Sequence, residues 1–190
     1  MKPGDRLMQQ SKRLAMGILF GSLIFVAKVS IPSPANKMIV GVQALVLALA
    51  ALLLKRGGAT YVSSVGGALT ALWNIALAPF TLFFALLYGL LVDGFFFLLR
   101  VKTSNGKVES TRLVAATTLS TMSVGLASYY VTVLLTKVIP RNLLVEIIIL
   151  AAGIANGAIA GYLAAIIWNN YLKDINLGRK LSEKSKAHQP

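Results

Sequence analysis

The sequence predicts an all-α integral membrane protein, a bundle of six transmembrane helices. Hydrophobic residues make up 56% of the 190-residue chain, and its mean hydropathy is +0.73. The stretch from Ala59 to Val92 holds thirty-four residues without one formal charge. As a single helix it would be about 50 Å long, against about 30 Å for a bilayer core, so we expect it to fold into two antiparallel helices.

Pro79 marks the expected turn inside this uncharged stretch, because proline interrupts a helix. We predict helices over 59–75 and 80–99, the second ending before Arg100. Polar and small residues recur on one face of the first leg, and we expect that face to point inward; they are Ser63, Gly67, Thr70 and Asn74. The second leg carries phenylalanines that we expect to meet lipid: Phe80, Phe83, Phe84, Phe95, Phe96 and Phe97.

The remaining apolar runs complete the bundle. A basic segment, 1–13, precedes the first run, which lacks a convincing small-residue cleavage site and is expected to stay as a helix. Prolines, glycines and basic residues separate the runs. The expected helices outside the uncharged stretch are 14–31, 38–54, 113–138 and 143–171, followed by a basic tail, 172–190. Ser104-Asn105-Gly106 predicts a turn in the polar loop between Arg100 and Arg112.

The distribution of positive charge predicts the orientation. With six spans, the loops and termini on one side carry fifteen lysines and arginines, and those on the other carry four. Such a bias marks the cytoplasmic side, so we expect both termini to be cytoplasmic and the protein to be a multi-pass component of the cell membrane. Topology and contact with anionic membrane lipids explain the basic excess better than nucleic-acid binding does.

Several chemistries are missing from the sequence. The chain has no cysteine, and its one histidine, His188, lies in the polar tail. No Gly-x-x-x-x-Gly-Lys-Ser/Thr loop for nucleotide phosphates is present. We therefore expect neither an enzyme, nor a metal site, nor a bound cofactor.

Polar residues at similar depth predict a pocket in the outer half of the membrane. They belong to the first, third, fifth and sixth predicted helices: Lys28, Trp73, Asn74, Tyr129, Glu146 and Asn156. One interpretation is structural, with the lysine extending to the interface, the tryptophan in an interfacial belt and the other residues joining helices. The other is a solute site, in which Trp73 stacks on a flat heterocycle and the asparagines bind its edge. Lys28 and Glu146 would pair or hold a charged substituent.

Asp93 and two sets of glycines complete the candidate residues. Asp93 lies in the inner part of its helix, and its role is open between pairing with a basic loop residue and coupling or proton movement. Gly153, Gly157 and Gly161 are spaced four apart, a pattern typical of close helix packing. Gly17 and Gly21 repeat the spacing in the first helix, where a partner protein could dock.

These features resemble the S components, the substrate-binding membrane subunits, of energy-coupling-factor (ECF) transporters. The similarity lies in six helices, the loop Ile31-Pro32-Ser33-Pro34 and the outer pocket. The segments Tyr61–Ala68 and Leu86–Asp93, with Gly89 four residues before Asp93, look most like the thiamine and hydroxymethylpyrimidine branch.

The resemblance implies a subunit that captures a vitamin-like solute from outside and works with a transmembrane coupling subunit and ATPase subunits. It also implies that outer loops cover the site, here residues 32–37, 75–79 and 139–142. The family docks its partner through an Ala-x-x-x-Ala pair in the first helix, where this chain has Gly17 and Gly21. The alternatives are a structural or assembly protein without a ligand, and an ion-coupled carrier using Lys28, Asp93 and Glu146.

Overall fold

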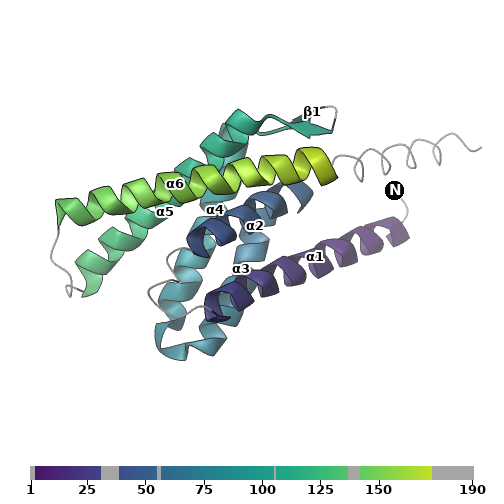
Figure 1. Cartoon of the computed structure of the whole chain (residues 1–190). Coiled ribbons are helices and arrows are strands. Elements are labelled where there is room, and N and C mark those ends of the chain that lie inside the picture. Colours follow the sequence, from purple (N-terminus) through teal and green to yellow (C-terminus); the bar gives the residue numbers. More distant parts are fainter. Residues whose placement is uncertain (1–2, 31–38, 55–56, 105, 137–141, 173–190) are drawn as a thin grey trace, which may run out of the picture.

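A computed structural model describes residues 3–30, 39–54, 57–104, 106–136 and 142–172, and in these residues the protein is almost entirely helical (Figure 1). The α-helices are α1 (Pro3–Ser30), α2 (Ile39–Leu54), α3 (Gly58–Trp73), α4 (Ala78–Leu98), α5 (Ser110–Val131) and α6 (Leu143–Ile167). A 3-10 turn, η2 (Ile75–Leu77), precedes α4, and π-helical segments, η3 (Thr132–Thr136) and η4 (Trp168–Leu172), extend α5 and α6. Two short strands, β1 (Thr103–Ser104) and β2 (Lys107–Val108), form an antiparallel hairpin between α4 and α5.

Where the structure describes them, the helices begin within three residues of the predicted starts, except at the N-terminus. There α1 begins at Pro3, well before the predicted Leu14, because charged residues do not stop a helix and proline fits its first turn. Pro79 likewise lies in the first turn of α4, so it starts that helix, whereas α3 ends at the C-cap Asn74. Of the predicted turn at Ser104-Asn105-Gly106, Asn105 lies outside the described residues; Ser104 pairs with Lys107, and Gly106 has a φ of 80° that favours glycine.

The helices form a bundle in which α5 and α6 pack as one pair and α3 packs with both α4 and α1. Figure 1 shows α1 and α6 on opposite sides, with α2, α3 and α4 between them. The start of α1, the strands and the end of α6 gather at one end, which we call the hairpin end. The α3–α4 turn and the start of α6 lie toward the other end, which we call the far end.

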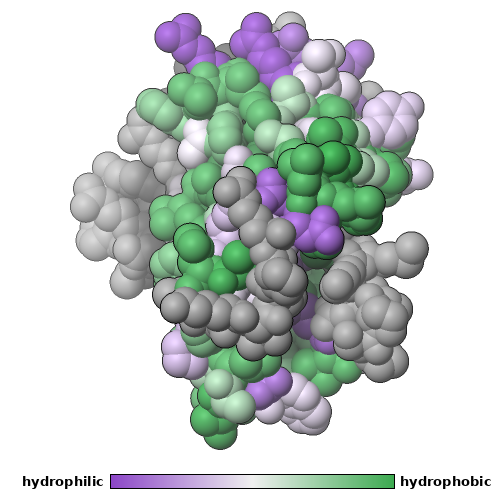
Figure 2. Space-filling view, turned by 90° about the vertical axis from the view of Figure 1, so that its left-hand side faces the viewer, coloured by the Kyte–Doolittle hydropathy of each residue, from purple (hydrophilic) through white to green (hydrophobic). Residues whose placement is uncertain are grey.

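The core lies where α2, α4, α5 and α6 meet. Its fully buried side chains include Leu47, Val92, Leu113 and Trp168. Large apolar side chains also cover much of the outer surface, as the space-filling view from the far end shows (Figure 2). Of the expected lipid-facing phenylalanines, Phe80, Phe83 and Phe97 are exposed, but Phe96 is buried in the core.

Three described helices are long and apolar enough to cross a membrane. These candidate spans are Arg13–Ser30, Ile75–Leu98 and Leu143–Leu172, while Val40–Leu54 is a shorter apolar helix. An outer surface this rich in apolar side chains is what a lipid environment requires, since lipid-facing side chains meet hydrocarbon. The fold and these helices support a membrane protein.

The glycines of α6 let it approach α5 closely. A Cβ atom added to Gly157 would lie 2.6 Å from Cα of Thr118, and one added to Gly153 would lie 3.0 Å from Cα of Met122. A Cβ on Gly161 would lie 2.8 Å from Cα of Val114. Backbone therefore faces backbone along this interface, which is the packing that small residues at four-residue spacing permit.

Candidate functional site

The first two predicted pocket elements, α1 and α3, meet through aromatic rings near the far end. Trp73, the last residue of α3, packs edge-on against Phe25 of α1, with ring centroids 6.3 Å apart. Its side chain is nevertheless 69% exposed. Lys28 is half-buried in the last turn of α1, and Asn74 is an exposed C-cap whose N–H donates to the Thr70 carbonyl. Trp73 and Asn74 thus lie next to each other at the exposed end of α3.

Tyr129 is joined to the start of α6, the helix of Glu146, through Asn142. The Tyr129 hydroxyl accepts a hydrogen bond from the Asn142 N–H (3.0 Å) and donates to the Asn142 carbonyl (3.3 Å). That carbonyl also accepts from the Glu146 N–H (3.2 Å), and the side chains of Tyr129 and Glu146 are both buried. Asn142 thus ties the Tyr129 hydroxyl to the start of α6, the helix that carries Glu146.

Asn142 was expected only as the end of the loop 139–142 over the site, and not as a binding residue. It is the N-cap of α6, where its side-chain oxygen accepts a hydrogen bond from the Leu144 N–H (2.9 Å). The sequence carries this signal, because asparagine directly before an apolar helical run is a preferred N-cap. Its backbone also bonds the Tyr129 hydroxyl, a contact that the sequence does not reveal.

Asn156 lies away from the other five residues, at the interface of α6 with α2. Its amide nitrogen donates to the Ala152 carbonyl one turn earlier (3.0 Å), and a Cβ added to Gly41 of α2 would lie 3.0 Å from its side-chain oxygen. The described contacts therefore place the six predicted residues in three groups: one on α1 and α3, one on α5 and α6, and Asn156 beside α2. Of the expected loops 32–37, 75–79 and 139–142, residues 32–37 and 139–141 lie outside the described residues, and 75–79 form η2 and the start of α4.

Gly17 and Gly21 do not form the open docking surface that the sequence suggested. Both are buried against α3. The space beside Gly17 is filled by the ring of Tyr61, and a Cβ on Gly21 would lie 2.7 Å from a methyl group of Val65. Their small size serves the packing of α1 on α3 within this chain.

The polar stripe of α3 also packs inside the bundle over most of its length. Ser63 is buried, and its hydroxyl donates to the Ala85 carbonyl of α4 (2.7 Å). A Cβ on Gly67 would lie 2.5 Å from Cβ of Ala85. Thr70 donates to its own helix, at the Gly66 carbonyl (2.7 Å). The inward orientation was predicted, but the stripe joins α3 to α4 instead of lining a cavity, except at exposed Asn74.

Asp93 of α4 caps the N-terminus of α3. One carboxylate oxygen accepts hydrogen bonds from the Thr60 N–H (2.8 Å) and the Thr60 hydroxyl (2.7 Å), and the other accepts from the Ala59 N–H (3.3 Å). These first-turn N–H groups have no partner within their own helix, and the positive end of the helix dipole favours a carboxylate there. The structure thus assigns Asp93 a role that neither alternative from the sequence included.

The end of α6 fixes the β1–β2 hairpin at the same end of the molecule. The Trp168 indole N–H donates to the Gly106 carbonyl (3.0 Å). The side-chain amide of Asn169 accepts from the Val108 N–H (2.8 Å) and donates to the Val108 carbonyl (3.1 Å), as a neighbouring strand would. Because Trp168 is only 1% exposed, the hairpin is held against the core.

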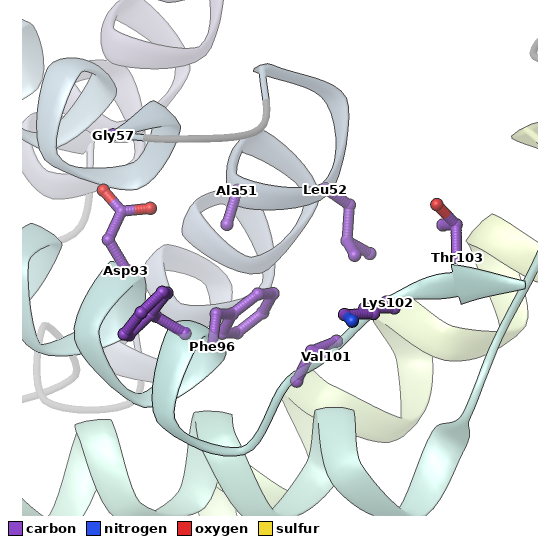
Figure 3. Close-up of a pocket in the computed structure, with 9 residues that line it drawn as sticks. Ala51, Leu52, Gly57, Asp93, Phe96, Val101, Lys102 and Thr103 are labelled. Atoms are coloured by element: carbon purple, nitrogen blue, oxygen red, sulfur yellow. The ribbon is translucent and has the colours of Figure 1, made fainter.

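A cavity of about 590 Å³ opens at the hairpin end, between α2, the start of α3, the end of α4 and β1 (Figure 3). Its walls combine apolar side chains of α2 and α4 with polar groups of the hairpin and Asp93. They are Ala51, Leu52, Gly57, Asp93, Phe96, Phe97, Val101, Lys102 and Thr103. The sequence did not predict this cavity. Among the described residues no cluster of histidine, aspartate and glutamate side chains is suited to a metal ion.

Comparison with known proteins yields one informative similarity. No protein-family model matches the chain, and no curated protein matches it. Among solved structures, a crystal structure of an S-component of an ECF transporter matches with a TM-score of 0.56 at 18% sequence identity. The match covers 98% of this chain and 96% of that one. The two proteins therefore share a fold over their whole length.

Proposed function

We propose that this protein is the solute-binding membrane subunit of an ECF-type transporter. The observation that carries the proposal is the shared fold, which extends over 98% of this chain and 96% of the S-component. Three apolar helices of membrane-spanning length support it, as does an outer surface covered with large apolar side chains. A subunit of this kind would require a transmembrane coupling subunit and ATPase subunits, because this sequence has no phosphate-binding loop of its own.

The proposed solute site is at the far end. There Trp73 offers an exposed indole face, and Asn74 offers an amide on the next residue. Lys28, in the last turn of α1, supplies an ammonium group from the same pair of helices. Tyr129 and Glu146 form a separate, buried candidate group on α5 and α6. Aromatic faces with a few polar groups suit a vitamin-like heterocycle, and the resemblance to the thiamine branch favours a thiamine precursor. The position of Asn156 beside α2 makes it the weakest candidate contact.

Ligand-dependent thermal stabilisation tests this function. The purified protein would be unfolded in detergent with thiamine, its hydroxymethylpyrimidine precursor and a panel of other vitamins. A specific solute at a hundred times its Kd should stabilise the folded state by about 2.7 kcal/mol. The Trp73→Ala variant should lose this response, while Phe97→Ala, an exposed aromatic at the hairpin end, should keep it. No response to any solute would favour a structural protein.

The proposed topology has six spans, with the hairpin end and both termini in the cytoplasm. Because the chain has no cysteine, single cysteines report sidedness directly. Ala76→Cys, exposed in η2 at the far end, should react with an impermeant thiol reagent added outside intact cells. Lys107→Cys, exposed in β2, should react only after permeabilisation. Labelling of Lys107→Cys from outside would overturn the topology and the site built on it.

A further inference from the structure

The cavity at the hairpin end is lined by apolar side chains in one part and by a cationic side chain in another. Leu52 and Phe97 belong to its apolar walls, and Lys102 and Thr103 line it from the hairpin. Phe97 is 82% exposed, and the next residue, Leu98, is 70% exposed, so the end of α4 carries apolar groups on its outer surface. Exposed Arg100 follows two residues after Leu98. Apolar surface therefore changes to positive charge within a few residues, beside an open cavity.

The carboxylate of Asp93 does not make this cavity unsuitable for an anion. Both of its oxygens are engaged by donors at the start of α3. The partial positive charge at that helix end further offsets the negative charge of Asp93. Figure 3 shows the carboxylate near Gly57, with Lys102 on the side of the cavity away from it. The ammonium group of Lys102 is therefore available to a negatively charged ligand.

We infer that the hairpin-end cavity binds an anionic phospholipid, with the phosphate at Lys102 and an acyl chain against Phe97 and Leu52. The inference rests on the proposed function only for the placement of this end at the cytoplasmic face, where anionic lipids are concentrated. A volume of about 590 Å³ is adequate for a head group, within the roughly 300–1,000 Å³ of small-molecule sites. Free phosphate would not contact the exposed Phe97, whereas a lipid would contact both Phe97, through its acyl chain, and Lys102, through its phosphate.

Lipid titration of the purified full-length protein tests this inference. Phosphatidylglycerol and phosphatidylcholine would be added to the protein in detergent, and bound lipid would be counted by native mass spectrometry. Phosphatidylglycerol should bind specifically, and Lys102→Gln should weaken its binding about fivefold, the effect of one cation near a lipid phosphate. Lys107→Gln is the matched control, because it removes the same charge from the same hairpin at an exposed residue that does not line the cavity. It should change the affinity less than twofold.

A second pair of variants tests the acyl-chain contact. Phe97→Ala should weaken the binding of phosphatidylglycerol, whereas Leu98→Ala should not, because Leu98 is similarly exposed but lies outside the cavity lining. Both side chains bury little surface in the protein, so both variants should fold. The inference would be overturned if phosphatidylcholine bound as tightly, if Lys102→Gln and Lys107→Gln had equal effects, or if inorganic phosphate displaced the lipid. Failure of the vitamin panel with these lipid effects intact would reject the proposed function alone.

Discussion

The two tryptophans of this protein occupy opposite ends of the bundle and contrasting environments. At the hairpin end Trp168 is 1% exposed and donates to the Gly106 carbonyl, while toward the far end Trp73 is 69% exposed and touches Phe25 only edge-on. Other side chains at the hairpin end also bond to the backbone of neighbouring elements. Asp93 of α4 accepts from Thr60 of α3, and Asn169 of η4 accepts from Val108 of β2. The hairpin end is therefore a fixed base, whereas at the far end Trp73 and Asn74 are exposed and Tyr129, bonded to Asn142, is buried.

Truncating each tryptophan should give the largest difference between the two ends. Trp168→Ala removes a fully buried ring and leaves the Gly106 carbonyl without its donor, so the free energy of unfolding should fall by about 3–5 kcal/mol. Trp73→Ala removes a mostly exposed ring and should cost less than about 1 kcal/mol. Thermal or denaturant unfolding in detergent measures both. Equal losses would show that the far end is as tightly packed as the hairpin end.

Removing Asp93 should have the next largest effect. Asp93→Ala leaves the N–H groups of Ala59 and Thr60 without their acceptor, and we expect a loss of about 2–3 kcal/mol of stability. Glu109 is a suitable control, because its only described ion pair is an exposed one with Arg112 (2.8 Å). Glu109→Ala should therefore change stability by less than about 1 kcal/mol. If Asp93→Ala and Glu109→Ala lost the same stability, the Asp93 cap would not contribute to the stability of the hairpin end.

Alanine at glycine positions should show how tightly α5 and α6 approach along their length. Gly157→Ala would bring a methyl group to 2.6 Å from backbone of α5, so it should cost about 1–3 kcal/mol. Gly125 lies nearer the far end, where a Cβ would meet only a methyl group of Ile149 at 3.3 Å, and its effect should be smaller. Gly94→Ala is the matched control, because nothing lies within 4 Å of its added Cβ. It should be neutral or stabilise α4 by up to about 1 kcal/mol. A neutral Gly157→Ala would contradict the close approach.

The sequence predicts the helices of this fold well and their contacts poorly. Uncharged length and Pro79 located the α3–α4 turn, because a bilayer limits how long an apolar helix can be. The partner of Asp93 could not be predicted, since Thr60 lies 33 residues away and its backbone N–H has no signature in the sequence. Spacing also showed that Gly17 and Gly21 share a face, but not that the ring of Tyr61 fills it.

The candidate site shows the same limit. Depth along each helix placed the predicted residues toward one end, which is a property of each helix alone. Which of them meet depends on how the helices pair, and this separates Asn156, beside Gly41, from Tyr129 and Glu146 at Asn142. The cavity at the hairpin end is formed by residues of α2 and α4, the N-cap of α3 and the segment that leads into β1, so no single segment of sequence could have predicted it.

The most direct test of the central claim is the fluorescence of Trp73 during a solute titration. Trp168→Phe leaves Trp73 as the one tryptophan in the chain, so its emission reports on the far end alone. With thiamine, its hydroxymethylpyrimidine precursor and other B vitamins as probes, we expect a saturable change in emission with one of them, which Asn74→Ala should shift to higher concentration. An emission that stays constant across the whole panel, in a protein that unfolds cooperatively, would contradict a solute site at the far end.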